Sequence, residues 1–230
     1  AITPEVTVVC GGNTLVKGTD YQITTVGSDN NYTTSGYVIV DSLQPTYYRN
    51  TPITVPFNIV FGADYLSVTG VADQYTYNGS VIKPTLTVKD NNGNVLPASV
   101  AYNSSTDGNA CVQVGTVTYT ATVTVAGQNL VKTGSYKIVQ RNVNTCTFGN
   151  ISNDTYTGSN LTPPVSVTYH GANLVKGSSG DYVISYANNT NPGVASVTVT
   201  GVNNYSGSRT MYFTISIGTV SKLNARGISN

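Results

Sequence analysis

The chain has 230 residues, a formal net charge of +1 and only 9% charged residues. So few charges argue against a nucleic-acid-binding protein, which needs a basic stripe, and no apolar run is long enough to cross a bilayer. Tyr occurs 17 times, Trp is missing and Glu5 is the single Glu, a composition that favours strands and turns over helices. A charge-poor surface of Ser, Thr and Asn suits an extracellular or cell-surface location.

The first stretch matches a later one closely. Residues 2–18, ITPEVTVVCGGNTLVKG, align with residues 161–177, LTPPVSVTYHGANLVKG, at a constant shift of 159. A Pro-led alternating strand at 4–10 is followed by a turn at Gly11, and residues 52–60 close the unit. We therefore predict a first repeat, residues 1–62, that has every strand of the later repeats except the opening one.

A second repeat is predicted over residues 63–141. It opens with ADYLSVTGVAD at 63–73, in which Leu66, Val68 and Val71 form the pattern of a strand with one buried face. A Tyr-x-Gly element, a Pro-led strand at 84–90 and a long alternating strand at 116–127 follow. The period is near 78 residues, which identifies tandem units.

The third repeat, residues 142–217, has the same order of features. Its opening segment, at 141–153, places apolar residues at Val143, Cys146, Phe148 and Ile151. Each repeat offers six or seven short strands bounded by turns. The predicted fold class is therefore all-β: tandem small antiparallel immunoglobulin-like sandwiches, the first of them incomplete.

The tail, residues 218–230, reads GTVSKLNARGISN and resembles an opening segment without the rest of its repeat. Aligning its ISN with residues 151–153 gives a shift of 77. The four apolar positions then become the predicted donor-strand residues Val220, Leu223, Ala225 and Ile228. Because the first repeat lacks this strand, we expect the tail of one copy to complete the first repeat of another by β-augmentation. The expected partner is a second copy of the chain, joined head to tail.

Residues 163–216 carry a family resemblance. They combine DYVISYANN, GVASVTVTG, the turn NNYSG and a final YFTIS strand. This pattern resembles the tandem immunoglobulin-like repeats of bacterial surface proteins. The resemblance covers most of the chain and implies extracellular display, spacing or adhesion. It implies no catalytic residues.

Residues that could carry chemistry are few. The one His, His170, falls in a predicted hairpin turn, and the acids form no close pair, so we expect no enzyme, no cofactor and no metal site. DNNGN at 90–94 is similar to a calcium loop but lacks the final Glu, and a β-turn explains it better. Lys17 and Lys176 could be considered for an isopeptide cross-link, but each adjoins a Gly turn and is expected to be exposed.

Three cysteines lie in different repeats. Cys146 takes a predicted core position and is expected to pack as a small hydrophobe, whereas Cys10 or Cys111 could form an intermolecular disulfide. The recurrent tyrosines, such as Tyr21 with Tyr182, are expected to pack within the repeats.

Two functions follow. We predict a non-catalytic subunit of a surface fibre or pilus-like filament assembled by strand donation. The alternative is a stalk or adhesin fragment of a larger surface protein that spaces its partners or binds surface glycans.

Overall fold

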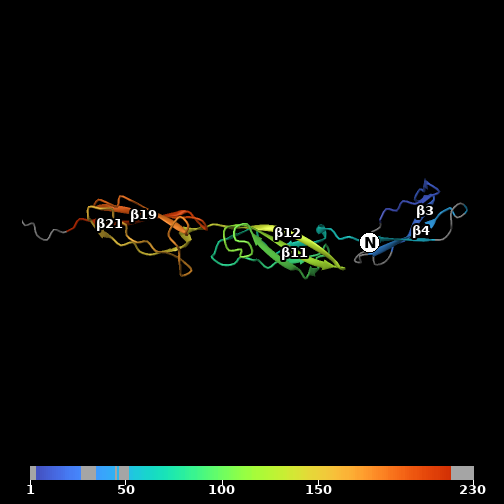
Figure 1. Cartoon of the computed structure of the whole chain (residues 1–230), viewed down its shortest axis with the longest axis horizontal. Helices are drawn as coiled ribbons and strands as arrows, with labels where there is room; N and C mark the ends of the chain where they lie inside the picture. The colour runs from blue at the N-terminus through green and yellow to red at the C-terminus, as the bar shows by residue number, and fades with distance from the viewer. Residues whose placement is uncertain (1–3, 27–34, 45, 47–51, 219–230) are drawn as a thin grey trace, which may run out of the picture. The chain divides into compact units, whose positions relative to one another are not determined.

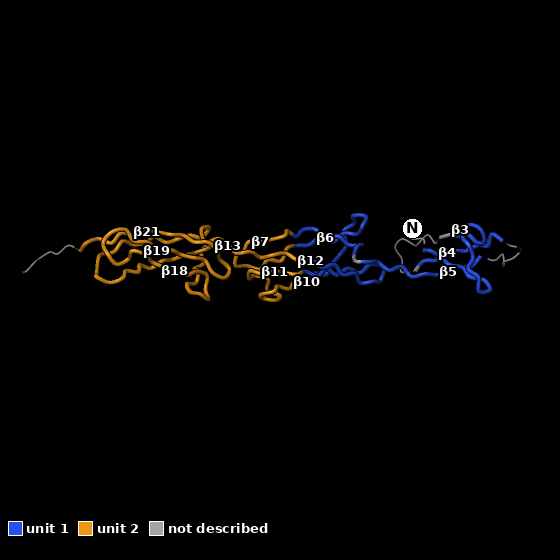
Figure 2. The backbone as a smooth tube through the Cα atoms, turned by 90° about the horizontal axis from the view of Figure 1, so that it is seen from above, with its two compact units in different colours: residues 1–71, 85–101, 119–134 blue, residues 72–84, 102–118, 135–230 orange. Residues whose placement is uncertain are grey.

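The computed structural model describes residues 4–26, 35–44, 46 and 52–218. Its elements are β-strands apart from two single turns of 3-10 helix, η1 and η2 (Figure 1). The expected fold class, all-β with tandem immunoglobulin-like sandwiches, is confirmed. The chain packs into two compact units, residues 1–71, 85–101 and 119–134 in one and residues 72–84, 102–118 and 135–230 in the other (Figure 2). Because their boundaries cross the second repeat, the three-repeat division of the chain stays a prediction.

The first repeat forms a hairpin and a three-stranded antiparallel sheet. The hairpin pairs β1 with β2, and the sheet order is β3-β4-β5. Alternation in β4 turns Val38 and Val40 inward, where they form a core with Tyr21. The strands are β1 (Val9–Cys10), β2 (Asn13–Thr14), β3 (Tyr21–Val26), β4 (Ser35–Ser42) and β5 (Ile53–Asn58).

The second repeat contains two sheets, with orders β6-β8-β9 and β10-β11-β12-β7. In β11 the buried residues alternate with threonines, which explains the sequence TVTYTATVTV. One core cluster gathers Leu66, Val88, Ala121, Val123 and Leu130. The elements are η1 (Ala63–Tyr65), β6 (Ser67–Thr69), β7 (Gln74–Thr76), β8 (Thr87–Lys89), β9 (Val95–Leu96), β10 (Ser99–Ser104), β11 (Gly115–Val125) and β12 (Gln128–Val139).

The third repeat has the sheets β14-β16-β17 and β15-β21-β19-β18, and a short ladder of β13 with β20. Its core lies in two clusters, one around Val143, Val167 and Tyr182 and the other around Phe213 and Ile215. The elements are β13 (Arg141–Asn142), η2 (Val143–Thr145), β14 (Thr147–Phe148), β15 (Asp154–Thr155), β16 (Val167–Tyr169), β17 (Ala172–Asn173), β18 (Tyr182–Ala187), β19 (Gly193–Gly201), β20 (Tyr205–Ser206) and β21 (Ser208–Ser216).

Within the described part of the chain three strand pairs are parallel, which the expectation of antiparallel sheets did not include. They are β7 with β12, β13 with β20 and β15 with β21. A parallel pair needs a crossover between its strands. Nearly a whole repeat separates β7 from β12 and β15 from β21, so the chain between them supplies that crossover.

Candidate assembly site

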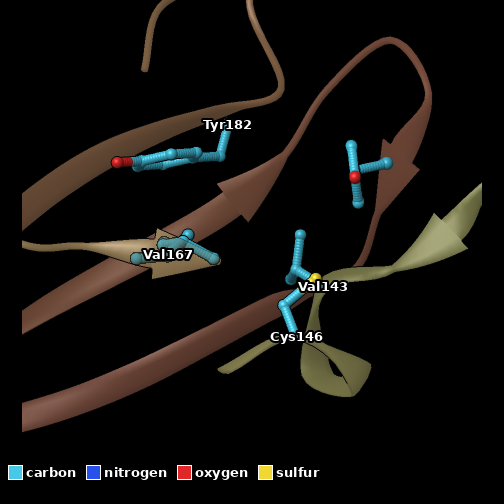
Figure 3. Packing of buried hydrophobic residues seen from close by; sticks show 6 residues of the cluster. Val143, Cys146, Val167 and Tyr182 are labelled. Carbon is cyan, nitrogen blue, oxygen red and sulfur yellow. The ribbon is translucent and has the colours of Figure 1, made fainter. Parts of the chain in front are cut away.

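The opening segment of the third repeat shows how a first strand is held. Val143 in η2 is 0% exposed, and Cys146 directly after η2 is also buried. Figure 3 shows both side chains pointing into the core space that Val167 and Tyr182 also enter. The side chain of Asn142 caps η2 by accepting the Asn144 N–H at 2.9 Å. The apolar residues of this segment are therefore core residues of the repeat.

The opening segment and the connector after it, residues 154–159, each close an edge of one sheet. β14 pairs antiparallel with β16, and the Gly149 N–H donates to the Ser166 carbonyl at 3.0 Å. The chain then crosses over, β15 pairs parallel with β21, and the Tyr156 N–H donates to the Ser216 carbonyl at 2.9 Å. The opening segment therefore closes the β16 edge, and the connector that follows it, residues 154–159, closes the β21 edge.

The second repeat is built in the same way. β6 pairs antiparallel with β8, and β7 pairs parallel with β12. The Tyr77 N–H donates to the Val139 carbonyl at 2.9 Å, which is the counterpart of the bond from Tyr156. Leu66 is buried at the position that Cys146 takes in the third repeat. Two consecutive repeats therefore each begin with an opening segment of the same kind.

The rest of the first repeat follows the third closely. The Tyr21 hydroxyl donates to the Val6 carbonyl at 2.5 Å, as the Tyr182 hydroxyl does to Val165 at 3.3 Å. The Asp20 carboxylate accepts the Val16 N–H at 2.8 Å, and Asp181 holds its own loop in the same way. These shared bonds make the third repeat a valid template for the first.

The first repeat differs where the opening segment would lie. Among its described residues no strand pairs with the outer edge of β1 or of β5. Val8 and Phe57 are half-buried, whereas their counterparts Val167 and Phe213 are each 2% exposed. On the two edge strands Val9 is 58% and Ile53 is 60% exposed. We call these two edges, with Val8, Val9, Ile53 and Phe57, the open seam.

The predicted donor residues Val220, Leu223, Ala225 and Ile228 lie outside the described residues. Their counterparts Val143, Cys146, Phe148 and Ile151 all pack against the third-repeat core, the first two buried and the other two half-buried. The structure thus gives the template for a donor strand, while donation itself stays a prediction.

Sequence reasoning missed the role of Arg141 at the start of this template. Its backbone N–H donates to the Asn204 carbonyl at 3.0 Å and its Nε donates to the Tyr77 carbonyl at 2.7 Å. Its guanidinium also lies 4.3 Å from the centre of the Tyr169 ring. A single Arg at a repeat boundary gives no local pattern, so no sequence signal identified it.

The three cysteines are free thiols in different environments. Burial raises the pKa of the Cys146 thiol, and its place in the core confirms that it packs as a hydrophobe. Cys111 is also buried, with its Sγ 3.5 Å from the Gly108 carbonyl, so it is not accessible for the disulfide considered above. Cys10 lies exposed on β1.

The other predicted chemistry-bearing residues have structural positions. His170 has a φ of 48° in the turn between β16 and β17, as predicted. Asp90 accepts the Asn94 side-chain amide and the Asn92 backbone N–H, each at 2.9 Å, within a tight turn, and these hydrogen bonds hold its pKa below the usual value. Lys17 and Lys176 are exposed, as expected.

No group of three metal-ligating side chains occurs within residues 4–26, 35–44, 46 and 52–218. In the same residues, no helix has the length and apolarity that a membrane span requires.

The recurrent tyrosines divide into buried and partly exposed ones. Tyr21 and Tyr182 are buried, which confirms the expectation that they pack. Tyr77 is half-buried and meets Tyr205 edge to face, with ring centres 5.5 Å apart. Its counterpart Tyr156 is 44% exposed.

Comparison with known proteins adds little. The sequence matches no protein family profile and no curated protein. Among solved structures, the crystal structure of the human desmocollin-1 ectodomain is similar, with 13% identity and a TM-score of 0.21. The alignment covers 85% of this chain and 50% of that one, so the chain spans half the length of that ectodomain. At this TM-score the likeness carries no argument about function.

Proposed function

We propose that this chain is a non-catalytic, extracellular structural subunit that assembles head to tail, the tail of one copy pairing with the β1 edge of the next. The observation that carries the proposal is the contrast between repeats. In the second and third, the opening segment closes one edge and the connector after it closes the other, whereas neither edge is closed in the described part of the first. The tail aligns with the opening segment alone, so the β1 edge is the one that it would close. Unpaired backbone groups beside exposed apolar side chains favour pairing with another strand.

The template specifies a register for the donated strand. In the third repeat Thr147 faces Thr168, and Phe148 faces Val167. A shift of 77 converts the first member of each pair to Asn224 and Ala225, and a shift of 159 converts the second to Val9 and Val8. The expected pairs between copies are therefore Asn224 with Val9 and Ala225 with Val8.

The seam also has the apolar surface that donation would cover. The alignment of β5 with β21 puts Ile53 at the position of Arg209. In the third repeat the guanidinium carbon of Arg209 lies 4.7 Å from the ring centre of Phe148 on the opening strand. Burial of Val220, Leu223 and Ile228 would contribute about 1.5–3 kcal/mol for each side chain. Ordering the tail offsets part of this gain.

Such contacts join different surfaces of identical subunits. A heterologous contact of this kind extends into a filament unless its geometry closes a ring. We therefore propose a surface fibre or pilus-like filament. Its subunits would be built from units that resemble the tandem immunoglobulin-like repeats of bacterial surface proteins. The alternative is a stalk within a larger surface protein. In a stalk, residues that precede the first repeat in the same polypeptide would supply the missing strand.

Disulfide trapping tests the register. We would combine Asn224→Cys and Val9→Cys in a Cys10→Ser background, so that the exposed native thiol cannot compete. Donation predicts a ladder of covalent oligomers on a non-reducing gel. The matched control pairs Asn224→Cys with Thr19→Cys, an exposed turn residue away from the seam. A well-folded chain that gives no ladder, or the same ladder with the control pair, would refute the proposal.

Deletion of residues 219–230 gives a second, independent test. Donation predicts soluble monomers whose first repeat melts earlier than in the intact chain. If the deletion changes neither assembly nor melting, strand donation is excluded and only the stalk hypothesis remains.

A further inference from the structure

A polar groove of about 640 Å³ lies between the turn at residues 203–204 of the third repeat, its loop at 175–181, and residues Tyr77 and Gln113 of the second repeat. All of these residues belong to the same compact unit. The strand-donation proposal makes no use of this groove.

One wall is held rigid by Asn203. Its side-chain amide donates to the carbonyls of Ser178 and Gly180, at 3.1 and 2.7 Å. The Asp181 carboxylate accepts the Val175 N–H at 2.8 Å across the same loop. A Cβ at Gly180 would lie 2.4 Å from the Val175 carbonyl oxygen, so this tight loop needs glycine. The loop therefore presents its polar groups in a fixed arrangement.

The opposite wall is equally constrained. The Asn204 side chain donates to Gln113 Oε1 at 2.5 Å and accepts the Val114 N–H at 3.1 Å. The Asp107 carboxylate fixes the backbone of this wall by accepting the N–H groups of Val112 and Gln113, at 2.8 and 2.9 Å. Preorganised walls lower the entropy that a ligand must lose on binding.

Several polar groups of the groove have no protein hydrogen bond among the described residues. They are the hydroxyls of Ser178 and Ser179, the second oxygen of Asp181 and the side-chain N–H groups of Gln113. A carboxylate accepts, an amide NH₂ donates and a hydroxyl does both, so together they suit a ligand that carries many hydroxyl groups. Beside them the half-buried Tyr77 supplies an aromatic surface.

From this arrangement we propose that the groove binds a neutral oligosaccharide. Neighbouring sugar hydroxyls would donate to Asp181 and accept from Gln113, with the two serines bonding the next sugar. Asp181 is the one charged residue that lines the groove in the described part of the chain, so acidic sugars would be repelled. One carboxylate is too few for a calcium site, so binding is expected to be independent of metal.

The test is titration of the full chain with neutral gluco-, manno- and galacto-oligosaccharides, and with a uronic acid oligosaccharide as the anionic counterpart. Binding is followed by saturation-transfer NMR and calorimetry. At least one neutral series should bind with a Kd in the millimolar range or tighter, with the uronate much weaker. The double variant Ser178→Ala with Ser179→Ala should weaken binding about five- to tenfold, because two hydrogen bonds to the ligand are lost.

Controls separate this site from general effects. The matched double variant Ser208→Ala with Ser216→Ala removes two exposed hydroxyls of β21 away from the groove and should leave the affinity unchanged. Asp181→Asn keeps an acceptor for the Val175 N–H and should remove the discrimination against the uronate. Three results would each overturn the proposal: no neutral oligosaccharide binds the folded chain, the groove double variant binds as tightly as the parent, or a chelator abolishes binding.

Discussion

A pair of equivalent substitutions tests whether the tail of one copy serves the first repeat of another as η2 and β14 serve the third. Val143→Ala removes two methyl groups from a side chain that is 0% exposed. The lost transfer free energy is about 1.6 kcal/mol, and the cavity left behind adds about 1 kcal/mol. The third repeat should therefore be destabilised by about 2–3 kcal/mol, or roughly 10–20 °C in its melting temperature.

Val220→Ala is the same change at the predicted donor position. If the tail is donated, it should destabilise the first repeat by a similar amount. This effect should depend on protein concentration, because the contact joins two molecules. The effect of Val143→Ala should not depend on concentration. The exposed Val194 of β19 supplies the control, since Val194→Ala removes the same methyl groups without leaving a cavity.

Hydrogen exchange measured by mass spectrometry is the appropriate assay, because tandem repeats need not unfold in one step and exchange reports each repeat separately. Amides of β4 report the first repeat, and amides of β19 report the third. The reasoning is refuted if Val220→Ala leaves the exchange of β4 unchanged at every concentration while Val143→Ala has its expected effect on β19.

Three further outcomes are expected. Gly134→Ala should destabilise the chain by about 1–3 kcal/mol in chemical denaturation, because the added Cβ would lie 2.2 Å from the hydroxyl oxygen of the buried Tyr119. Gly62→Ala is the control and should be nearly neutral, because the atom nearest to its added Cβ, the Asp64 backbone nitrogen, is 4.0 Å away. Asn204→Ala should speed hydrogen exchange at the Val114 N–H, whose acceptor it removes; unchanged exchange would show that this bond is dispensable. Burial opposes ionisation of Asp107, but hydrogen bonds from backbone N–H groups outweigh it and lower its pKa. Its ionised form therefore stabilises the fold above the ordinary carboxyl pKa, and this contribution is lost as the pH falls through the lowered value; acid titration of Asp107→Asn should lack that component.

Much of the fold could be predicted from local patterns in the sequence. Alternation identified the inward residues of β19, such as Val197 and Val199, because side chains on a strand point to opposite faces in turn. The turn at His170 was predictable because its counterparts in the other repeats are Gly11 and Asn91, residue types that tolerate a positive φ. Repetition placed Cys146 in the core before any contact was known, since Leu66 takes the same position.

The groove was beyond prediction from sequence. Asn203 and Asn204 belong to a turn that the sequence identified, but their partners do not follow from it. Gln113 lies 91 positions from Asn204, and the two side chains meet because residues 102–118 and 135–230 pack into the same compact unit. Nothing in the spacing of a polar turn indicates which distant strand its amides will contact.

The sequence by itself determined the strand alternation and the turns, because these depend on residues close together in the chain. The match between repeats predicts the repeat period and a first repeat without its opening strand. Tertiary structure decided that the opening segment and the connector after it serve the two sheets in turn, the first antiparallel to β16 and the second parallel to β21. It also decided which backbone edges of the first repeat stay unpaired among its described residues. The physical reason is that a strand can hydrogen-bond on either side and in either direction, and only the packing of the whole repeat selects its neighbour.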